Sequence, residues 1–406
     1  MHLAIELQGV VIATLEGGTR SFDLRATEEG IERFGINSTV LSVIMPLVRS
    51  PRRDRAGRRR NWFDELLPEG DQYDHMLAQA SLKEGDTPAF LARYGRDIAG
   101  ALQVWDLDDP AEPPPPSCRT LDDTEVRELL EDPMTSPLAN HPHAGKTSLG
   151  GVQPKIALAR TETGWAQALG GLPTTHIIKP RLTGALASTI FDEEYGARLA
   201  RRLSLLTFDT TIERFAGLDA LVIERFDRRE GLRVHQEDFS QILGAHGPQK
   251  YQEIGGRVSL RRVADVLQRF TSAEDLRRLA RMVVLAVGIG NLDMHTKNLG
   301  LLQQPVGEIG LAPAYDLVPQ GHRPGDGRMA LAVNRRYRHA DLTRDDLVAE
   351  LTTWGLRRAE HLVDETLARL NEAIEAEEPL PGAHPEVKEY VRRYTTNLVR
   401  HRPAGA

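Results

Sequence analysis

A polar loop that directly follows a long apolar segment is the feature that most constrains this chain. Residues 282–292 are mostly apolar, and the chain then reads D-M-H-T-K-N, with Asp293 and Asn298 at its two ends. Two short apolar runs follow within residues 299–311 and predict a β-hairpin. Asp316 comes shortly after them. A polar loop, a predicted hairpin and an aspartate therefore follow one another within a short stretch of sequence.

This order and spacing are typical of the catalytic loop of a protein kinase and of the metal-binding aspartate that follows it. Asp293 can accept the proton of an incoming hydroxyl group. Asn298 and Asp316 offer the hard oxygen atoms that Mg²⁺ prefers. Asn and Asp also occur in loops simply to satisfy turn backbone. Turn residues have no reason to adopt this joint arrangement, so the sequence predicts phosphoryl transfer.

Composition sets the broader limits. A length of 406 residues suggests two or three domains, and the formal charge of -7 argues against wholesale binding of nucleic acid or anionic membrane. The single cysteine, Cys118, excludes an intrachain disulfide and a cysteine-based metal site. Residues 1–15 show no secretory signal pattern, and the longest apolar stretch is too short to span a bilayer. A cytoplasmic protein is expected.

The pattern along the chain predicts three regions. Residues 1–110 form an α/β module that begins with two strand-like runs, and a proline-rich linker at 110–116 follows it. Residues 111–228 are rich in predicted strands, whereas helices dominate 229–406, with Ser259, Ser272 and Thr343 as predicted N-caps. We therefore expect an α+β, two-lobed fold like that of protein kinases, with an additional N-terminal α/β subdomain.

Lys179 is the candidate for the lysine that grips ATP. It ends a short apolar strand in H-I-I-K-P. A buried lysine at a strand end needs an anion, either the nucleotide phosphates or a glutamate of the next predicted helix, Glu193 or Glu194. The alternative is a lysine whose amine simply reaches solvent from a strand edge.

The segment L-V-I-E-R-F-D carries candidate adenosine contacts. The backbone at Glu224 can hydrogen-bond an adenine edge, Phe226 can pack on the base, and Asp227 can accept from a ribose hydroxyl. The alternative is a strand that ends in a charged turn.

Two adjacent glycines, Gly150 and Gly151, suggest a phosphate-binding loop because backbone without Cβ atoms can approach phosphate closely. A structural turn before a strand is the alternative. A rival reading is a P-loop ending at residues 144–147, but Asn140 stands where that motif requires glycine, and no strand precedes it.

With these motifs in order, the chain resembles the HipA family of serine/threonine kinase toxins, whose partners are DNA-binding HipB antitoxins. The resemblance covers nearly the whole chain. Its segments are F-D-E-L-L-P-E-G-D, Y-G-R-D-I-A-G-A-L-Q, G-G-V-Q-P-K, H-I-I-K-P, E-R-F-D-R, Q-E-D-F-S-Q, G-N-x-D-x-H-x-K-N and Y-D-L. The chain departs from ordinary protein kinases in its glycine loop and in Leu317 and Val318, which follow Asp316 where phenylalanine and glycine are usual.

The resemblance implies a role for each candidate residue. It implies ATP binding by Ser148, Gly150, Gly151, Val152, Lys179, Glu224, Phe226 and Asp227, catalysis by Asp293 with support from His295 and Lys297, and Mg²⁺ binding by Asn298 and Asp316. Ser148 matches the autophosphorylated serine of the family. The segment from Gln236 to Gln241 is shared with the family, but the sequence alone suggests no secure role for it.

The function implied is phosphorylation of a protein serine or threonine with ATP and Mg²⁺, and growth arrest as the outcome. Family members act on aminoacyl-tRNA synthetases, notably glutamyl-tRNA synthetase. The alternative is a catalytically weak module that binds a HipB-like repressor and tunes transcription. The retained Lys179, Asp293, Asn298 and Asp316 speak against that alternative, since a scaffold need not keep them.

Seven arginines lie between Arg49 and Arg60. Such runs are commonly solvated loops. The other interpretation is that these arginines contact DNA phosphates while the protein is bound to a HipB-like antitoxin. In that case the protein contacts DNA only as part of the antitoxin complex.

Overall fold

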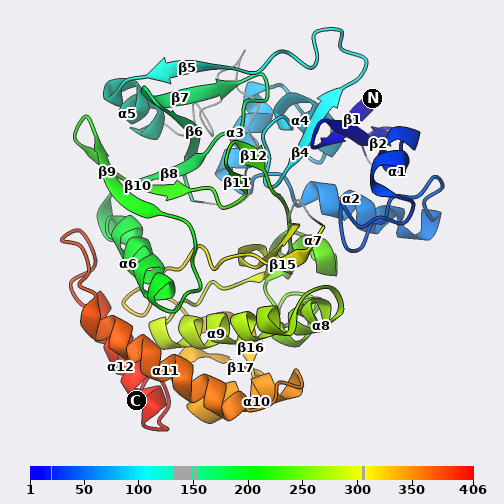
Figure 1. Cartoon of the computed structure of the whole chain (residues 1–406). Helices are drawn as coiled ribbons and strands as arrows, with labels where there is room; N and C mark the ends of the chain where they lie inside the picture. The colour runs from blue at the N-terminus through cyan, green and yellow to red at the C-terminus, as the bar shows by residue number, and fades with distance from the viewer. Residues whose placement is uncertain (20, 132–148, 150–152, 304–306) are drawn as a thin grey trace. The chain divides into compact units, whose positions relative to one another are not determined.

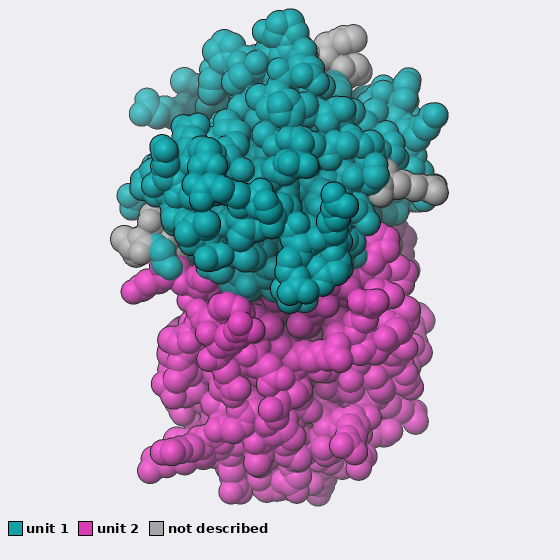
Figure 2. Space-filling view, turned by 90° about the vertical axis from the view of Figure 1, so that its right-hand side faces the viewer, with its two compact units in different colours: residues 1–180, 213–237, 302–307 teal, residues 181–212, 238–301, 308–406 magenta. Residues whose placement is uncertain are grey.

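The computed structural model describes residues 1–19, 21–131, 149, 153–303 and 307–406 (Figure 1). The chain forms two compact units (Figure 2). Unit 1 comprises residues 1–180, 213–237 and 302–307, and unit 2 comprises residues 181–212, 238–301 and 308–406.

Unit 1 begins with an antiparallel sheet in the order β3-β2-β1-β4. Its strands are β1 (His2–Leu7), β2 (Val10–Glu16), β3 (Asp23–Ala26) and β4 (Leu102–Asp106). The predicted hairpin is confirmed: Gln8 and Gly9 join β1 to β2 with φ of 54° and 81°, as a two-residue hairpin turn requires. The accompanying helices are α1 (Glu28–Phe34), η1 (Arg53–Arg55), α2 (Ala56–Asp64), α3 (Asp71–Gln79) and α4 (Thr87–Tyr94).

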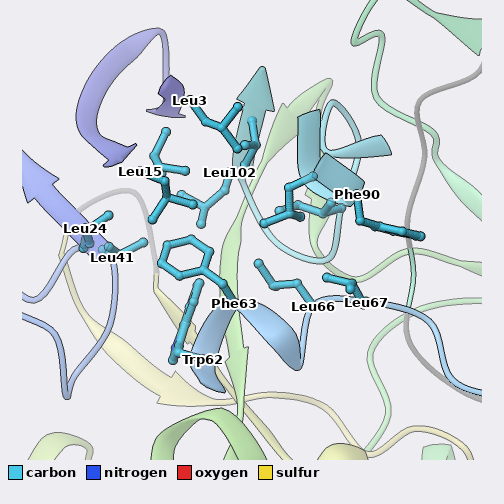
Figure 3. Packing of buried hydrophobic residues seen from close by; sticks show 14 of the residues in the cluster. Leu3, Leu15, Leu24, Leu41, Trp62, Phe63, Leu66, Leu67, Phe90 and Leu102 are labelled. Carbon is cyan, nitrogen blue, oxygen red and sulfur yellow. The ribbon is translucent and has the colours of Figure 1, made fainter. Parts of the chain in front are cut away.

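A hydrophobic cluster beneath this sheet holds α2 in place (Figure 3). Trp62 and Phe63 are fully buried, and they pack with residues such as Leu3 and Leu102. Burial of each large apolar side chain contributes about 1.5–3 kcal/mol. Ala157, from beyond the proline-rich segment, belongs to the same cluster. Most other buried residues that follow that segment in unit 1, such as Ile156 and Trp165, form a hydrophobic cluster of their own.

A second, six-stranded sheet has the order β5-β7-β6-β8-β10-β9. Its strands are β5 (Ser117–Leu121), β6 (Ile156–Thr161), β7 (Gly164–Leu169), β8 (His176–Pro180), β9 (Thr210–Phe215) and β10 (Leu218–Glu224). The predicted richness of this region in strands is confirmed. The accompanying elements are α5 (Asp123–Glu131), β11 (Arg228–Arg229), β12 (Leu232–Arg233) and β13 (His235–Asp238).

Unit 2 is mainly helical. Its helices are η3 (Gly184–Leu186), α6 (Thr189–Arg202), α7 (Phe239–Leu243), η4 (Gly247–Lys250), α8 (Leu260–Phe270), α9 (Ala273–Ile289), η5 (Thr296–Asn298), η6 (His339–Asp341), α10 (Arg344–Thr353), α11 (Ala359–Ala376) and α12 (Val387–Val399). Its short strands are β14 (Gly300–Gln303), which ends in unit 1, β15 (Ile309–Leu311), β16 (Arg328–Val333) and β17 (Arg336–Arg338).

The buried helix α9 is the centre of unit 2, where it packs against α8, α10, α11 and α12 (Figure 1). The predicted N-caps are confirmed, because the side chains of Ser259, Ser272 and Thr343 each accept a hydrogen bond from a backbone N–H of the first turn. Among the described residues, no helix is both long enough and apolar enough to cross a membrane.

Candidate active site

The polar loop begins where α9 ends. Gly290 caps the helix with φ of 68°, and a Cβ there would lie 2.9 Å from the ring of Tyr394, so the position needs glycine. Asn291 follows and is buried. Its Oδ1 accepts from the Asp293 N–H at 3.3 Å, and its Nδ2 lies 3.5 Å from the Asp316 carbonyl oxygen. Asn291 thus holds the loop beside the segment that carries Asp316.

The structure brings Asp293, Asn298 and Asp316 together within unit 2. The Asn298 side-chain amide donates to the Asp293 carbonyl at 3.0 Å and to the Asp316 carboxylate at 3.1 Å. Asp316 has φ of 57°, a left-handed conformation that aspartate tolerates better than most residues. The predicted catalytic aspartate and the two predicted metal ligands therefore share one small site, although they are separated in sequence.

Asn298 and Asp316 fit a shared Mg²⁺ ion by their chemistry. The Asn298 amide donates to the Asp316 carboxylate at 3.1 Å, so the two side chains lie close enough that they would hold one ion together. Within the described residues, no group of three or more His, Cys, Asp or Glu side chains forms a candidate metal site. Few protein ligands are nonetheless usual for Mg²⁺ bound with a nucleotide, because phosphates and waters complete its coordination.

His295 and Lys297 support the loop from the side. His295 is buried, its N–H donates to the Asp293 carbonyl at 2.8 Å, and its Nε2 lies 3.9 Å from Asp293 Oδ2. Lys297 Nζ lies 3.7 Å from Asp238 Oδ2 and is largely buried. These contacts favour a supporting role for both residues over direct contact with a transferring phosphate.

Asp293 opens onto a groove of about 480 Å³ in unit 2. Its side chain is 42% exposed, so a hydroxyl group from another molecule can reach the carboxylate. Residues with polar or aromatic side chains line the groove: Tyr251, Glu253, Gln320, Arg323, Asp326 and Arg328. The volume falls in the range of small-molecule and peptide-side-chain sites. The groove therefore gives the predicted base access to a substrate.

The sequence suggested no secure role for the segment from Gln236 to Gln241. In the structure its side chains make buried hydrogen bonds, Glu237 in unit 1 and Ser240 in unit 2. Glu237 is almost fully buried in unit 1, where its carboxylate accepts from Ser42 Oγ at 2.6 Å, Val43 N–H at 2.9 Å and Trp62 Nε1 at 2.9 Å. Glu237 thereby fixes the loop before α2 and α2 itself.

The next residues of this segment act in unit 2. Asp238 caps α7 through a capping box with Gln241 and also faces Lys297. Ser240 shares a 2.8 Å hydrogen bond with the Thr296 hydroxyl. The segment therefore braces the polar loop that carries Asp293.

The nucleotide candidates of unit 1 lie on the six-stranded sheet. Lys179 is buried on β8 opposite Leu221 of β10. Glu224 ends β10 and is exposed, and the following N–H, of Arg225, donates to the Thr175 carbonyl at 2.9 Å. Phe226 is half-buried. The predicted loop residues Ser148, Gly150, Gly151 and Val152, and the P-loop alternative at 144–147, lie outside the described residues.

Asp227 lies in a buried network of charges. Its carboxylate accepts from Arg225 at 2.8 and 2.9 Å, from the Gly100 N–H at 2.7 Å and from Gln236 at 3.1 Å. Burial by itself would raise the pKa of Asp227, but the charges of Arg225 and Arg228 outweigh it and hold the pKa below its usual value. This arrangement favours a structural role for the Asp227 carboxylate over the predicted ribose contact.

The same network explains two motifs of the sequence together. Asp97, from Y-G-R-D-I-A-G, pairs with Arg225 at 3.3 Å and with Arg228 at 2.8 Å, both from E-R-F-D-R. Thr174 also donates to Asp97 at 2.6 Å. All of these groups lie in unit 1. The arginines of the second motif thus hold the end of β10 to the segment before β4.

Comparisons with known proteins identify the family of the chain. Residues 3–105 match the HipA N-terminal domain, and residues 147–374 match the HipA-like C-terminal domain. The chain is 31% identical over 334 residues to the putative kinase Y4mE of Sinorhizobium fredii, covering 78% of this chain and 79% of the relative. It is 28% identical over 360 residues to the serine/threonine-protein kinase toxin HipA of Shewanella oneidensis, covering 82% and 81%.

A solved structure is similar over almost the full length. The HipA protein of Shewanella oneidensis, determined in complex with HipB and its operator DNA, matches with a TM-score of 0.78 and 26% identity, covering 98% of this chain and 96% of that one. The match confirms the predicted kinase-like α+β fold. With both family domains present in order, the chain belongs to the HipA family.

Proposed function

We propose that this chain is an ATP- and Mg²⁺-dependent kinase that phosphorylates a serine or threonine of a protein and thereby arrests growth. The observation that carries the proposal is the convergence of Asp293, Asn298 and Asp316 beside an open groove. The named kinases among the relatives support the same class of reaction. A cytoplasmic location, where ATP and aminoacyl-tRNA synthetases are found, is part of this proposal.

In this proposal each unit has a distinct task. In unit 1, Lys179 neutralises phosphate charge, and the backbone at Glu224 and Phe226 holds the adenine. In unit 2, Asp293 accepts the proton of the acceptor hydroxyl, while Asn298 and Asp316 hold the metal. ATP with bound Mg²⁺ supplies the transferred phosphoryl group and an ion that neutralises its charge.

The proposal is tested with γ-labelled ATP and an extract of host proteins. We expect one or a few proteins to become labelled on serine or threonine, and mass spectrometry then identifies the target. An aminoacyl-tRNA synthetase is the class we expect. A purified chain that binds ATP but labels no protein would favour the alternative of a catalytically weak module that binds a repressor.

The proposed partner is a HipB-like DNA-binding antitoxin, and the exposed arginines of η1 and α2 are the proposed DNA contacts. Contacts with acids are seen for Arg49 with Glu28, for Arg52 with Asp54 and for the buried Arg59 with Asp23. Arg53, Arg55 and Arg58 are exposed. Because these three side chains are exposed and lie close together along the chain, they are the ones to change in a test of phosphate contact.

Changing Arg53, Arg55 and Arg58 to Gln should flatten the salt dependence of operator binding by the antitoxin complex. Each lost phosphate contact lowers the slope of log K against log salt by about 0.9. Titrations of operator DNA at several salt concentrations measure the slope. The exposed Arg257, Arg400 and Arg402 of unit 2, changed to Gln, serve as the matched control. Equal slopes for both triple variants and the parent complex would indicate that the arginine run is a solvated loop that does not contact DNA.

A further prediction is self-inactivation by phosphorylation of Ser148. A phosphate adds about -1.5 to -2 charge, at a loop proposed to hold the phosphates of ATP. The neighbouring Leu149 is buried in the N-terminal hydrophobic cluster, so a charged group beside it should displace the loop. Mass spectrometry should find phosphate on Ser148 in active, ATP-treated protein and none in the Asp293→Asn variant. An unmodified Ser148 in the active protein would refute this route.

A further inference from the structure

Tyr251 makes a direct contact with the predicted catalytic base. Its hydroxyl donates a hydrogen bond to Asp293 Oδ1 at 3.1 Å. Its ring meets the His295 ring edge to face, with centroids 5.4 Å apart and planes at 85°. Tyr251 also lines the groove onto which Asp293 opens. The sequence motifs did not single out this residue, because it lies more than forty positions before Asp293.

The backbone around Tyr251 is tied to the catalytic loop on both sides. On one side the Thr296 hydroxyl donates to the Lys250 carbonyl at 3.3 Å. On the other side the Gln252 N–H donates to the Ala330 carbonyl at 3.0 Å, and the Ala330 N–H donates to the Leu292 carbonyl at 2.8 Å. The loop, β16 and residues 250–252 therefore form a closed frame that fixes the distance between Tyr251 and Asp293.

We propose that Tyr251 is a positioning residue that holds the Asp293 carboxylate in the orientation needed for transfer. A hydrogen bond to one carboxylate oxygen restricts rotation of the group, and the phenol O–H of tyrosine is the donor of that bond. Correct placement of a reacting group accounts for a large part of enzymatic rate enhancement. This inference rests on the proposed kinase function.

The hydroxyl, rather than the ring, carries this role. Tyr251 is only partly buried, so its ring contributes less to the core than the fully buried aromatic residues do. Other charged groups at the groove, Glu253 and Arg328, pair with each other. Removal of the single oxygen atom in Tyr251→Phe therefore tests the hydrogen bond while it keeps the ring contact with His295.

The experiment compares steady-state kinetics of the wild type, Tyr251→Phe and the control Tyr390→Phe. Tyr390 lies on α12, where it packs against Tyr394 and His322. The assay uses γ-labelled ATP with Mg²⁺ and a host-protein extract as acceptor. We expect kcat to fall about tenfold in Tyr251→Phe, a fraction of the effect of a general base, with KM for ATP and the melting temperature unchanged. Tyr390→Phe should match the wild type.

Three results would overturn the inference. Wild-type kcat in Tyr251→Phe would show that the hydroxyl does not position Asp293. A raised KM for ATP with unchanged kcat would assign the hydroxyl to nucleotide binding instead. Absence of transfer by the wild-type chain would reject the proposed function itself, and the inference with it. Loss in Tyr251→Phe alone, against an active wild type and control, supports positioning.

Discussion

Asp293→Asn is expected to reduce phosphoryl transfer by about 10² to 10⁴, the usual effect of removing a positioned general base. The amide has nearly the size of the carboxylate but cannot accept a proton from the acceptor hydroxyl. The fold should persist, because the backbone contacts of the loop, from Asp293 N–H to Asn291 and from Asn298 to the Asp293 carbonyl, do not involve the side chain. A labelled-phosphate assay measures the rate.

Asp265→Asn provides the matched control for this variant. Asp265 is half-exposed on α8 and pairs with Arg261 one turn away, an interaction of about 0.3–0.5 kcal/mol. The control should keep wild-type activity and melting temperature. Near-wild-type transfer by Asp293→Asn would show that another group accepts the proton.

Replacement of Asp316 should abolish the magnesium dependence of nucleotide binding. Asp316 is the proposed carboxylate ligand, and without it the metal is left with the Asn298 amide as its neighbouring protein ligand. Asp316→Asn is the sharper variant, since asparagine also tolerates the left-handed backbone of this position, whereas alanine adds backbone strain. Asp316→Ala should show the same metal effect with an additional loss of stability.

Titration of a non-hydrolysable ATP analogue, with and without Mg²⁺, measures this dependence. The wild type and Asp265→Asn should bind the analogue more tightly with Mg²⁺, whereas both Asp316 variants should bind it equally in the two conditions. A magnesium effect of full size in Asp316→Asn would assign the metal to other ligands.

Features that depend on neighbouring residues were predictable from the sequence. The N-caps at Ser259, Ser272 and Thr343 and the turn at Gln8 and Gly9 follow from local backbone chemistry, and the structure confirms them. The richness of the second sheet region in strands was also predictable from the sequence. The loop, hairpin and aspartate order predicted that Asp293, Asn298 and Asp316 lie near one another, and the structure shows hydrogen bonds among them. Their roles stay predictions.

Features that depend on distant partners were not predictable. Tyr251 contacts Asp293 across 42 positions, and Glu237 contacts Trp62 across 175. The sequence around Asp293 or Glu237 does not indicate that its carboxylate accepts a hydrogen bond from a residue far away in the chain. Asp227 shows the opposite case: its position in a family motif suggested a ligand contact, while the structure surrounds it with arginines that were read only as neighbours in a charged turn.

Asn291 shows a third case. The residue was visible within the motif G-N-x-D, but its spacing gave no function. Its two hydrogen-bonding partners, Asp293 and the Asp316 backbone, become evident only when the loop and the later segment are side by side. The role of a residue that supports a site without lining it therefore becomes clear only from the structure, even when its motif is recognised.

We propose that Asp293 and Asp316 together promote transfer of the γ-phosphoryl group of ATP to a protein hydroxyl. The most direct measurement incubates the purified wild type, Asp293→Asn and Asp316→Asn with γ-labelled ATP, Mg²⁺ and host-protein extract, and then follows the label into phosphoserine and phosphothreonine. We expect protein-bound label with the wild type and almost none with either variant. Equal labelling by all three proteins, or label released only as inorganic phosphate by the wild type, would contradict it.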